Sequence, residues 1–251
     1  MIKVVGQNKG FKIEKKIIDY VNKKLFNEIN LNYKVLIKKM FDLSHSRNPI
    51  VRCFKEEGIG LEKKTDLIFE LENQRLNISV KSGSANSVHQ EKFNSFLEFL
   101  DSVSQLKIIE KDLIKEFHWC DGSTDNTGLV KDRKRKNIYA NLHPTNFTKY
   151  ITILRRYKKD IFLRTWLGGS KNTPDYLIYI TNINEIHSPK VINFSDLLDA
   201  HMNYKEKRGD IGLLTIQNWN ACLKGQDLKP KSLKHRNDVQ FKSKDIKNFF
   251  L

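Results

Sequence analysis

The sequence contains few cysteines, and their positions do not suit cross-linking or metal binding. Cys53, Cys120 and Cys222 lie far apart and form no C-x-x-C pair. Disulfide frameworks use an even number of cysteines, and structural zinc sites use closely paired ones. We therefore expect neither a disulfide framework nor a zinc site.

Long apolar segments are also missing. No apolar run approaches the roughly 20 residues that a membrane-spanning helix needs. The first residues, MIKVVGQNKGFKIEKK, lack an apolar stretch followed by a small-residue cleavage site, which argues against a secretory signal. We expect a cytoplasmic protein without a membrane partner.

The sequence has fewer acidic than basic residues. Asp and Glu number 29 against 45 Lys and Arg, which gives a formal net charge of +16. This excess favours a polyanionic partner, because each phosphate neutralised by a basic side chain releases counterions. The strongest basic stretch covers residues 131–164, where eleven Lys or Arg stand against two Asp, with Tyr139, Phe147, Tyr150 and Tyr157 interleaved. The alternative for this stretch is a solvated helix surface.

The pattern of apolar residues predicts an α/β fold with a mixed central sheet flanked by helices. Apolar residues at helical spacing predict a helix over residues 12–27, and a second helix from Phe93 onward. Two strand-like runs in KTDLIFELENQRLNISVKSG flank the polar turn 72–75 and predict a β-hairpin. Further strands are predicted at residues 175–181 and 212–217. At 251 residues the chain can form one domain, and we expect residues 1–251 to do so.

The predicted hairpin carries residues suited to metal-dependent chemistry. Alternate residues of a strand share a face, so Ser79 and Lys81 project together while Ile78 and Val80 point into the core. Asp66 begins the partner strand. An acid there could bind a hard divalent cation such as Mg²⁺, and Lys81 could orient or deprotonate an attacking water.

This motif is weak when taken alone. The alternative is an exposed hairpin with a surface lysine and an aspartate at a turn. A literal Pro-Asp pair occurs at Pro174-Asp175, but no acid-x-Lys triplet follows it, since Ile186 and His187 follow Glu185. We therefore interpret Asp175 as a residue that begins a strand.

The hairpin resembles the active-site hairpin of type II restriction endonucleases of the PD-(D/E)xK superfamily, in particular a group of CCGG-cutting and GCGC-cutting enzymes. In that group an amide replaces the usual acid of the acid-x-Lys triplet, and here Ser79 stands in that place. The segments GFKIEKKIIDY, FTKYITILRRYKKDIFLRTWLGG, IGLLTIQNW and VQFK follow in the same order as their counterparts. The resemblance covers most of the chain loosely and these segments more closely.

The resemblance implies a restriction-endonuclease-like core with catalytic residues Asp66, Ser79 and Lys81. It implies a Mg²⁺ ion bound by Asp66 and the backbone carbonyl of Val80. A hydroxyl is a neutral and weaker ligand than a carboxylate, so Ser79 could contact the ion through water or leave coordination to Asp66 and Val80. An acid elsewhere could fill the charge deficit. Glu14 on the first helix is one candidate, and its alternative is an exposed residue on a Lys-rich face. Glu70, on the same strand face as Asp66, is a second candidate.

Sequence reading is expected elsewhere in the chain. The catalytic core is predicted in roughly residues 1–120, and the DNA-contacting elements in roughly 121–251 together with the loop after Lys81. Gln and Asn can pair bidentately with adenine, and Lys with guanine. The residues predicted to contact DNA are Asn86, His89, Gln90, Thr215, Gln217, Asn218, Gln240 and Lys242. A structural role is the alternative for each of them.

These observations predict a Mg²⁺-dependent type II restriction endonuclease that cuts double-stranded DNA at a short sequence and leaves 5′-phosphate ends. Two alternatives stay open: a structure-selective or repair nuclease of the same fold, and a DNA-binding protein that has lost catalysis. The sequence does not decide between a monomer and a homodimer. A restriction enzyme would also imply a cognate DNA methyltransferase that protects host DNA.

Overall fold

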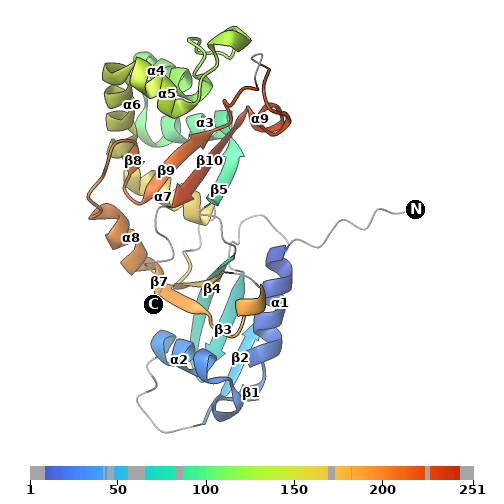
Figure 1. Cartoon of the computed structure of the whole chain (residues 1–251). Coiled ribbons are helices and arrows are strands. Elements are labelled where there is room, and N and C mark those ends of the chain that lie inside the picture. The colour runs from blue at the N-terminus through green and yellow to red at the C-terminus, as the bar shows by residue number, and fades with distance from the viewer. Residues whose placement is uncertain are drawn as a thin grey trace. The chain divides into compact units, whose positions relative to one another are not determined.

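The computed structural model describes residues 9–41, 43, 48–55, 66–82, 87–168, 173–181, 183–223 and 227–243. The chain divides into two compact units (Figure 1). Unit 1 comprises Met1–Asn86, Leu167–Asp199 and Asp245–Leu251, and unit 2 comprises Ser87–Trp166 and Ala200–Lys244. No unit boundary falls near residue 120, where the catalytic core was expected to end. That the two units act together as one endonuclease domain stays a prediction.

Unit 1 is built around a six-stranded mixed sheet. The strand order is β1-β2-β3-β4-β6-β7, and every neighbouring pair is antiparallel except β4 and β6. The strands are β1 Lys24–Leu25, β2 Ile50–Phe54, β3 Leu67–Leu71, β4 Gln74–Ser82, β6 Tyr176–Ile180 and β7 Lys190–Asn193. The helices are α1 Lys9–Val21, η1 Phe26–Glu28, α2 Leu31–Met40 and η3 Ile183–Glu185. The predicted mixed α/β architecture, a mixed sheet flanked by helices, is confirmed.

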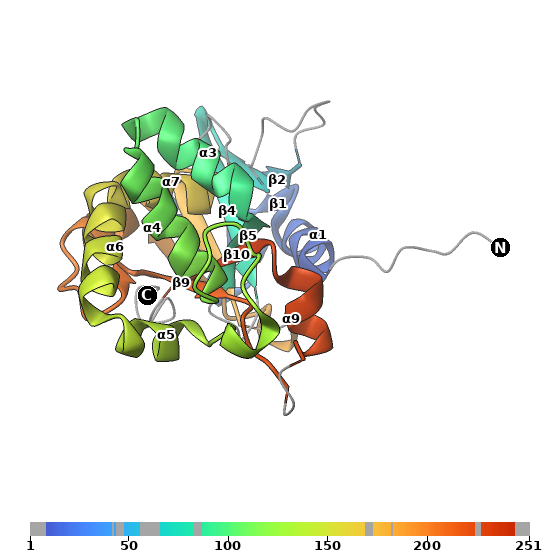
Figure 2. The ribbon, with the colours of Figure 1, turned by 90° about the horizontal axis from the view of Figure 1, so that it is seen from above.

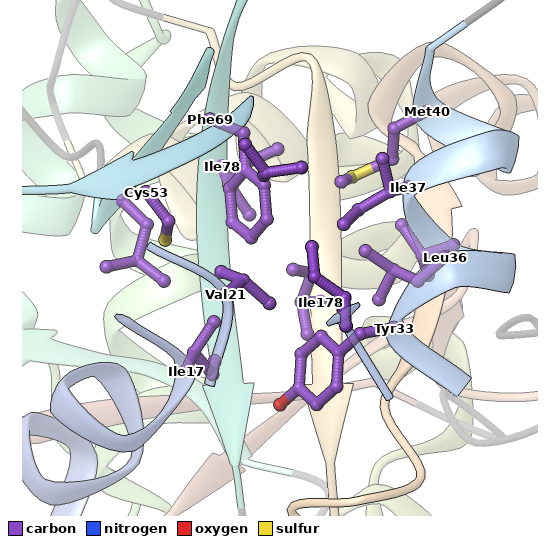
Figure 3. Packing of buried hydrophobic residues seen from close by; sticks show 14 of the residues in the cluster. Ile17, Val21, Tyr33, Leu36, Ile37, Met40, Cys53, Phe69, Ile78 and Ile178 are labelled. Atoms are coloured by element: carbon purple, nitrogen blue, oxygen red, sulfur yellow. The ribbon is translucent and has the colours of Figure 1, made fainter. Parts of the chain in front are cut away.

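Helices α1 and α2 cover one face of this sheet. Figure 3 shows Ile17 and Val21 of α1 and Leu36 of α2 converging on Phe69 of β3 and Ile178 of β6. All five side chains are buried, and they belong to one continuous apolar cluster. Burying such side chains stabilises the fold by about 1.5–3 kcal/mol each relative to exposure. Because this packing covers one face of the strands, residues with a chemical role must lie on the other face or at the strand ends.

The first helix ends earlier than the sequence predicted. The apolar rhythm suggested a helix through residue 27, but α1 ends at Val21 and Leu25 lies in β1 with an exposed side chain. Lys23 adopts a left-handed backbone conformation with φ 59°, and its N–H donates to the carbonyl of Val51 at 2.8 Å. The prediction was wrong because pairing with β2 competes successfully with the last helical turn.

The hairpin prediction is confirmed, with a tighter turn than expected. Strands β3 and β4 are joined by Glu72 and Asn73 alone, while Gln74 and Arg75 belong to β4. Ile78 is fully buried in the apolar cluster, and Val80 packs against the same cluster. Ser79 and Lys81 therefore share the opposite face, as strand alternation predicted.

Unit 2 combines a four-stranded antiparallel sheet with a group of helices. The sheet order is β5-β10-β9-β8. The strands are β5 Ser87–Lys92, β8 Asp210–Ile211, β9 Leu214–Asn218 and β10 Asp238–Ser243. The helices are α3 Phe93–Ser104, α4 Ile108–Trp119, η2 Val130–Asp132, α5 Lys136–Leu142, α6 Pro144–Arg156 and α9 Pro230–His235. Two further helices, α7 Lys158–Leu167 and α8 Phe194–Met202, cross the unit boundary. Figure 2 shows α4 between α3 and α6. No helix of the described residues is long and apolar enough to cross a membrane.

Candidate active site and candidate recognition face

The predicted catalytic residues of unit 1 gather at one end of its sheet. Phe54, near the end of β2, pairs with Ile68 near the start of β3. Leu67, the first residue of β3, pairs with Ile78 on the last part of β4. The ends of β2 and β4 therefore meet the start of β3. This sheet end carries the cluster that we call the acid-lysine cluster: Glu14, Lys55, Asp66, Ser79 and Lys81.

Asp66 is held by hydrogen bonds to β4. Its backbone N–H donates to the carbonyl of Ile78 at 3.0 Å, which extends the β3–β4 ladder by one bond. Its carboxylate oxygen Oδ2 accepts from the N–H of Val80 at 2.7 Å and from the hydroxyl of Ser79 at 3.0 Å. Asp66 thus occupies a defined position directly before the strand, and Ser79 is a partner of the carboxylate.

The backbone of Val80 faces the same place. The N–H and C=O of one strand residue point to the same side of the strand. Since the N–H of Val80 points to Asp66, its carbonyl also points to the β3 side, beyond the first residue of β3. The carbonyl of Val80 and the carboxylate of Asp66 therefore lie on the same side of β4.

Lys81 lies within the electrostatic reach of both predicted acids. Burial lowers the pKa of the Lys81 ammonium, and the carboxylates of Asp66 and Glu14 act in the opposite direction. Glu14 also forms a short ion pair with Lys55, a residue that the sequence did not single out. The only sequence signal for Lys55 is its place directly after a strand, which is too common to identify a site. The cluster is a balanced set of two carboxylates and two ammonium groups.

The donor set fits a hard divalent cation, with few charged ligands. Its donors are the carboxylates of Asp66 and Glu14, the carbonyl of Val80 and the hydroxyl of Ser79, all of which are oxygens. Magnesium binds through one or two carboxylates and keeps several waters. In the part of the chain that the structure describes, no group of three or more His, Cys, Asp or Glu could hold a metal ion. A metal bound here would rely on water and on a substrate phosphate for its remaining ligands.

Two other acids have structural roles. Glu70 lies four residues from Asp66, about 13 Å along the strand, and is 3.7 Å from Arg75. It is therefore too far away to share a cation with Asp66. Asp175 directly precedes β6, and its carboxylate accepts from the N–H of Asn77 at 2.7 Å. This confirms that Asp175 begins a strand.

In unit 2, several predicted DNA-contacting residues share one face of the sheet. Gln240 of β10 lies directly opposite Gln90 of β5 and Gln217 of β9. Lys242 lies opposite Thr215 in the next row. Directly opposed residues of antiparallel strands point to the same face, with Cβ atoms about 5 Å apart. We call these five residues the glutamine face.

Three other predicted contacts are not part of this face. His89 and Asn218 lie on the opposite side of the sheet, because each is one residue away from a member of the glutamine face. The amide of Asn218 donates to the carbonyls of Phe117 and His118, in the last turn of α4, at 2.7 and 2.8 Å. His89 and Gln90 lie in strand β5 rather than in the expected loop. Asn86 lies outside the described residues.

The glutamine face has an anchoring group that the sequence analysis missed. The Asp238 carboxylate accepts from Gln90 at 2.9 Å and from Lys92 at 2.6 Å, and His235 lies 2.8 Å from it. A signal was present in the sequence, since Asp238 and Gln240 alternate in one strand and must share a face.

The basic stretch of residues 131–164 is partly structural. Arg155, Arg156, Lys158 and Arg164 all pair with acids of unit 2. The interleaved aromatic residues Tyr139, Phe147 and Tyr150 are buried around Phe117. Internal ion pairs and aromatic packing, which the sequence analysis did not consider, therefore account for part of this stretch.

Neither a known protein family nor any curated protein matches the chain.

Proposed function

We propose that this protein is a sequence-specific endonuclease of double-stranded DNA with a restriction-endonuclease-like core. The acid-lysine cluster would hydrolyse the phosphodiester bond, and the glutamine face would contact bases. The observation that carries the proposal is the convergence of Asp66, Lys81 and Glu14 at one sheet end, beside the carbonyl of Val80.

In the proposed reaction, Asp66, Glu14 and the Val80 carbonyl would hold Mg²⁺. The ion would lower the pKa of a bound water and offset charge on the phosphate. Lys81 would orient the attacking water and stabilise negative charge on the reacting phosphate. Ser79 would keep Asp66 in place through its 3.0 Å hydrogen bond. Cleavage would leave a 5′-phosphate and a 3′-hydroxyl.

The glutamine face supports base reading rather than phosphate binding alone. It carries three amides in one row across three strands, with Lys242 in the next row on one side and Lys92, which is paired with Asp238, in the next row on the other side. Amide side chains form directional hydrogen bonds to base edges, whereas nonspecific binding depends on charge. This composition supports a sequence-specific enzyme over a structure-selective or repair nuclease.

The test is digestion of supercoiled plasmid DNA with and without Mg²⁺. We expect wild-type cleavage only with Mg²⁺, and none by Lys81→Met. The matched control is Lys38→Met, which removes an exposed lysine of α2 outside the cluster and should cut normally. Cleavage by folded Lys81→Met at the wild-type rate would contradict the assignment.

One observation favours a second candidate, a DNA-binding protein without catalysis. Ser79 replaces an acid, and the described part of the cluster contains only two carboxylates. This candidate predicts specific DNA binding without strand cleavage over a range of Mg²⁺ and Mn²⁺ concentrations. The same plasmid digestion, combined with a binding assay, separates the two.

A further inference from the structure

The side-chain amide of Gln90 is held in one orientation by its neighbours. Its nitrogen Nε2 donates to Oδ2 of Asp238 at 2.9 Å and lies 3.0 Å from Nδ1 of His235. Gln90 is exposed, whereas Asp238 is buried. The anchoring partner is therefore fixed in the sheet, and the glutamine reaches outward from it.

The chemistry of Asp238 determines which end of the amide faces it. Burial raises the pKa of Asp238, but hydrogen bonds from Lys92, His235 and Gln90 outweigh this and lower it. An ionised carboxylate can only accept hydrogen bonds. The amino group of Gln90 must therefore face Asp238, and its carbonyl oxygen Oε1 must face away.

The side-chain amides of Gln90 and Gln217 differ in their hydrogen bonds. Among the described residues, none donates a hydrogen bond to Oε1 of Gln90, and none forms a hydrogen bond with the side chain of Gln217. Gln217 can therefore turn either end of its amide outward. Gln90 turns its acceptor Oε1 outward because its amino group is held at Asp238, and this makes Gln217 its matched control.

Building on the proposed function, we infer that Asp238 is a positioning residue that makes Gln90 selective for a base with an exocyclic amine. In the major groove, adenine presents its N6 amine and cytosine its N4 amine, whereas guanine and thymine present keto oxygens at the corresponding positions. An outward carbonyl accepts from an amine and repels a keto oxygen. Gln90 would therefore meet an adenine or a cytosine.

The experiment starts with selection of bound duplexes from a random-sequence library in Ca²⁺, which supports binding without requiring cleavage. The selected duplex is then made with single amines deleted, by replacing adenine with purine or cytosine with 2-pyrimidinone. Single keto groups are deleted by replacing guanine with 2-aminopurine or thymine with 5-methyl-2-pyrimidinone. Dissociation constants are measured for wild type, Gln90→Ala, Gln217→Ala, Asp238→Asn and Lys92→Met.

We expect one amine deletion to weaken wild-type binding by roughly tenfold to a hundredfold. This penalty should disappear in Gln90→Ala and persist in Gln217→Ala. It should fall below about threefold in Asp238→Asn, whose neutral amide no longer fixes the orientation of Gln90. Lys92→Met should keep the penalty ratio, because Lys92 pairs with the other oxygen of Asp238.

A penalty in Gln90→Ala equal to that of wild type would overturn the inference, as would a keto deletion whose penalty depends on Gln90. If Asp238→Asn does not fold by circular dichroism, the comparison of Gln90→Ala with Gln217→Ala decides. Failure to select any duplex would refute both the inference and the proposed function. Specific binding without the Gln90 coupling would refute the inference alone.

Discussion

Asp66 is the residue on which the proposed chemistry depends most. Its carboxylate is aligned by two donors from the adjacent strand, and among the described residues it is one of two acids that act on Lys81. A catalytic carboxylate that is already fixed by hydrogen bonds needs no reorganisation when substrate arrives. The two donors differ, however, because one is backbone and only the other can be removed by substitution.

This difference predicts unequal effects of two substitutions. Asp66→Asn should lower kcat/KM by roughly a hundredfold or more, because it removes a charged metal ligand. Ser79→Ala should lower it by only about fivefold, because it removes one hydrogen bond worth about 1 kcal/mol while the Val80 N–H remains. Steady-state cleavage kinetics measure both. Equal losses in two folded variants would contradict the role assigned to Ser79.

The histidine His201 is buried in unit 2 as a neutral residue. The N–H of Leu213 donates to its Nδ1 at 3.0 Å, so Nε2 carries the proton and donates to the carbonyl of Lys158 at 3.0 Å. Burial lowers the pKa of His201 to about 4. The unfolded chain therefore binds more protons than the folded chain between about pH 4 and the ordinary histidine pKa of about 6.5.

This pKa shift predicts that stability is lost as pH falls. The free energy of unfolding of the wild type should drop by up to about 2 kcal/mol more than that of His201→Gln between pH 7 and pH 5. Glutamine can keep both hydrogen bonds but does not titrate. Urea denaturation at the two pH values provides the measurement. Parallel losses in both proteins would show that His201 does not contribute.

Among the structural elements, the hairpin of β8 and β9 depends on a single glycine. Gly212 has φ 55°, a left-handed conformation, and a Cβ at this position would lie 2.5 Å from the ring of His201. Two-residue hairpin turns with glycine at the first central position suit the twist of the flanking strands. The glycine therefore meets a backbone requirement and a packing requirement together.

We predict that Gly212→Ala lowers the melting temperature by several degrees, corresponding to about 1–3 kcal/mol from backbone strain and overlap with the ring. The control is Gly122→Ala, which shares a positive φ of 84° but has no atom within 4 Å of the added Cβ. Thermal unfolding should rank Gly212→Ala below Gly122→Ala. The reverse order would contradict the packing argument.

The sequence predicted those elements that carry a strong local signal. The β3–β4 hairpin combines two apolar runs with a polar turn, and the strand alternation correctly placed Ser79 and Lys81 on one face. The end of α1 could not be predicted, because the pairing of β1 with β2 depends on a contact between Lys23 and a residue far along the chain. Likewise, the sequence shows that Asp238 and Gln240 share a face, but it does not show that Asp238 contacts Gln90 on the neighbouring strand.

At the candidate site, too, the sequence predicted local features but not tertiary contacts. Asp66 and Lys81 follow from the spacing of a hairpin, since that motif is local. The pairing of Glu14 with Lys55 is a tertiary contact between a helix and a strand end. The separation of His89 and Asn218 from the glutamine face depends on strand register, and a shift of one residue reverses the face of every side chain.

For the whole molecule, the net charge of +16 predicts DNA binding that depends strongly on salt. Many basic residues are paired internally. The slope of log K against log salt concentration therefore reports only those that contact phosphates. If Lys242 contacts a phosphate, Lys242→Met should reduce the slope of log K against log salt concentration by about 0.9. Gln217→Ala should leave this slope unchanged. Fluorescence anisotropy from 50 to 300 mM salt is the measurement, and an unchanged slope in Lys242→Met would remove that contact.

The most direct test of the account is digestion of long, unmethylated phage DNA with purified protein and Mg²⁺, followed by sequencing of every end. The account predicts discrete fragments whose ends carry 5′-phosphates and share one short motif, and it predicts that Asp66→Asn produces none. Ends distributed without a common motif would contradict sequence specificity. Intact DNA that is nevertheless bound tightly by the wild type would contradict the central claim that this protein is a nuclease.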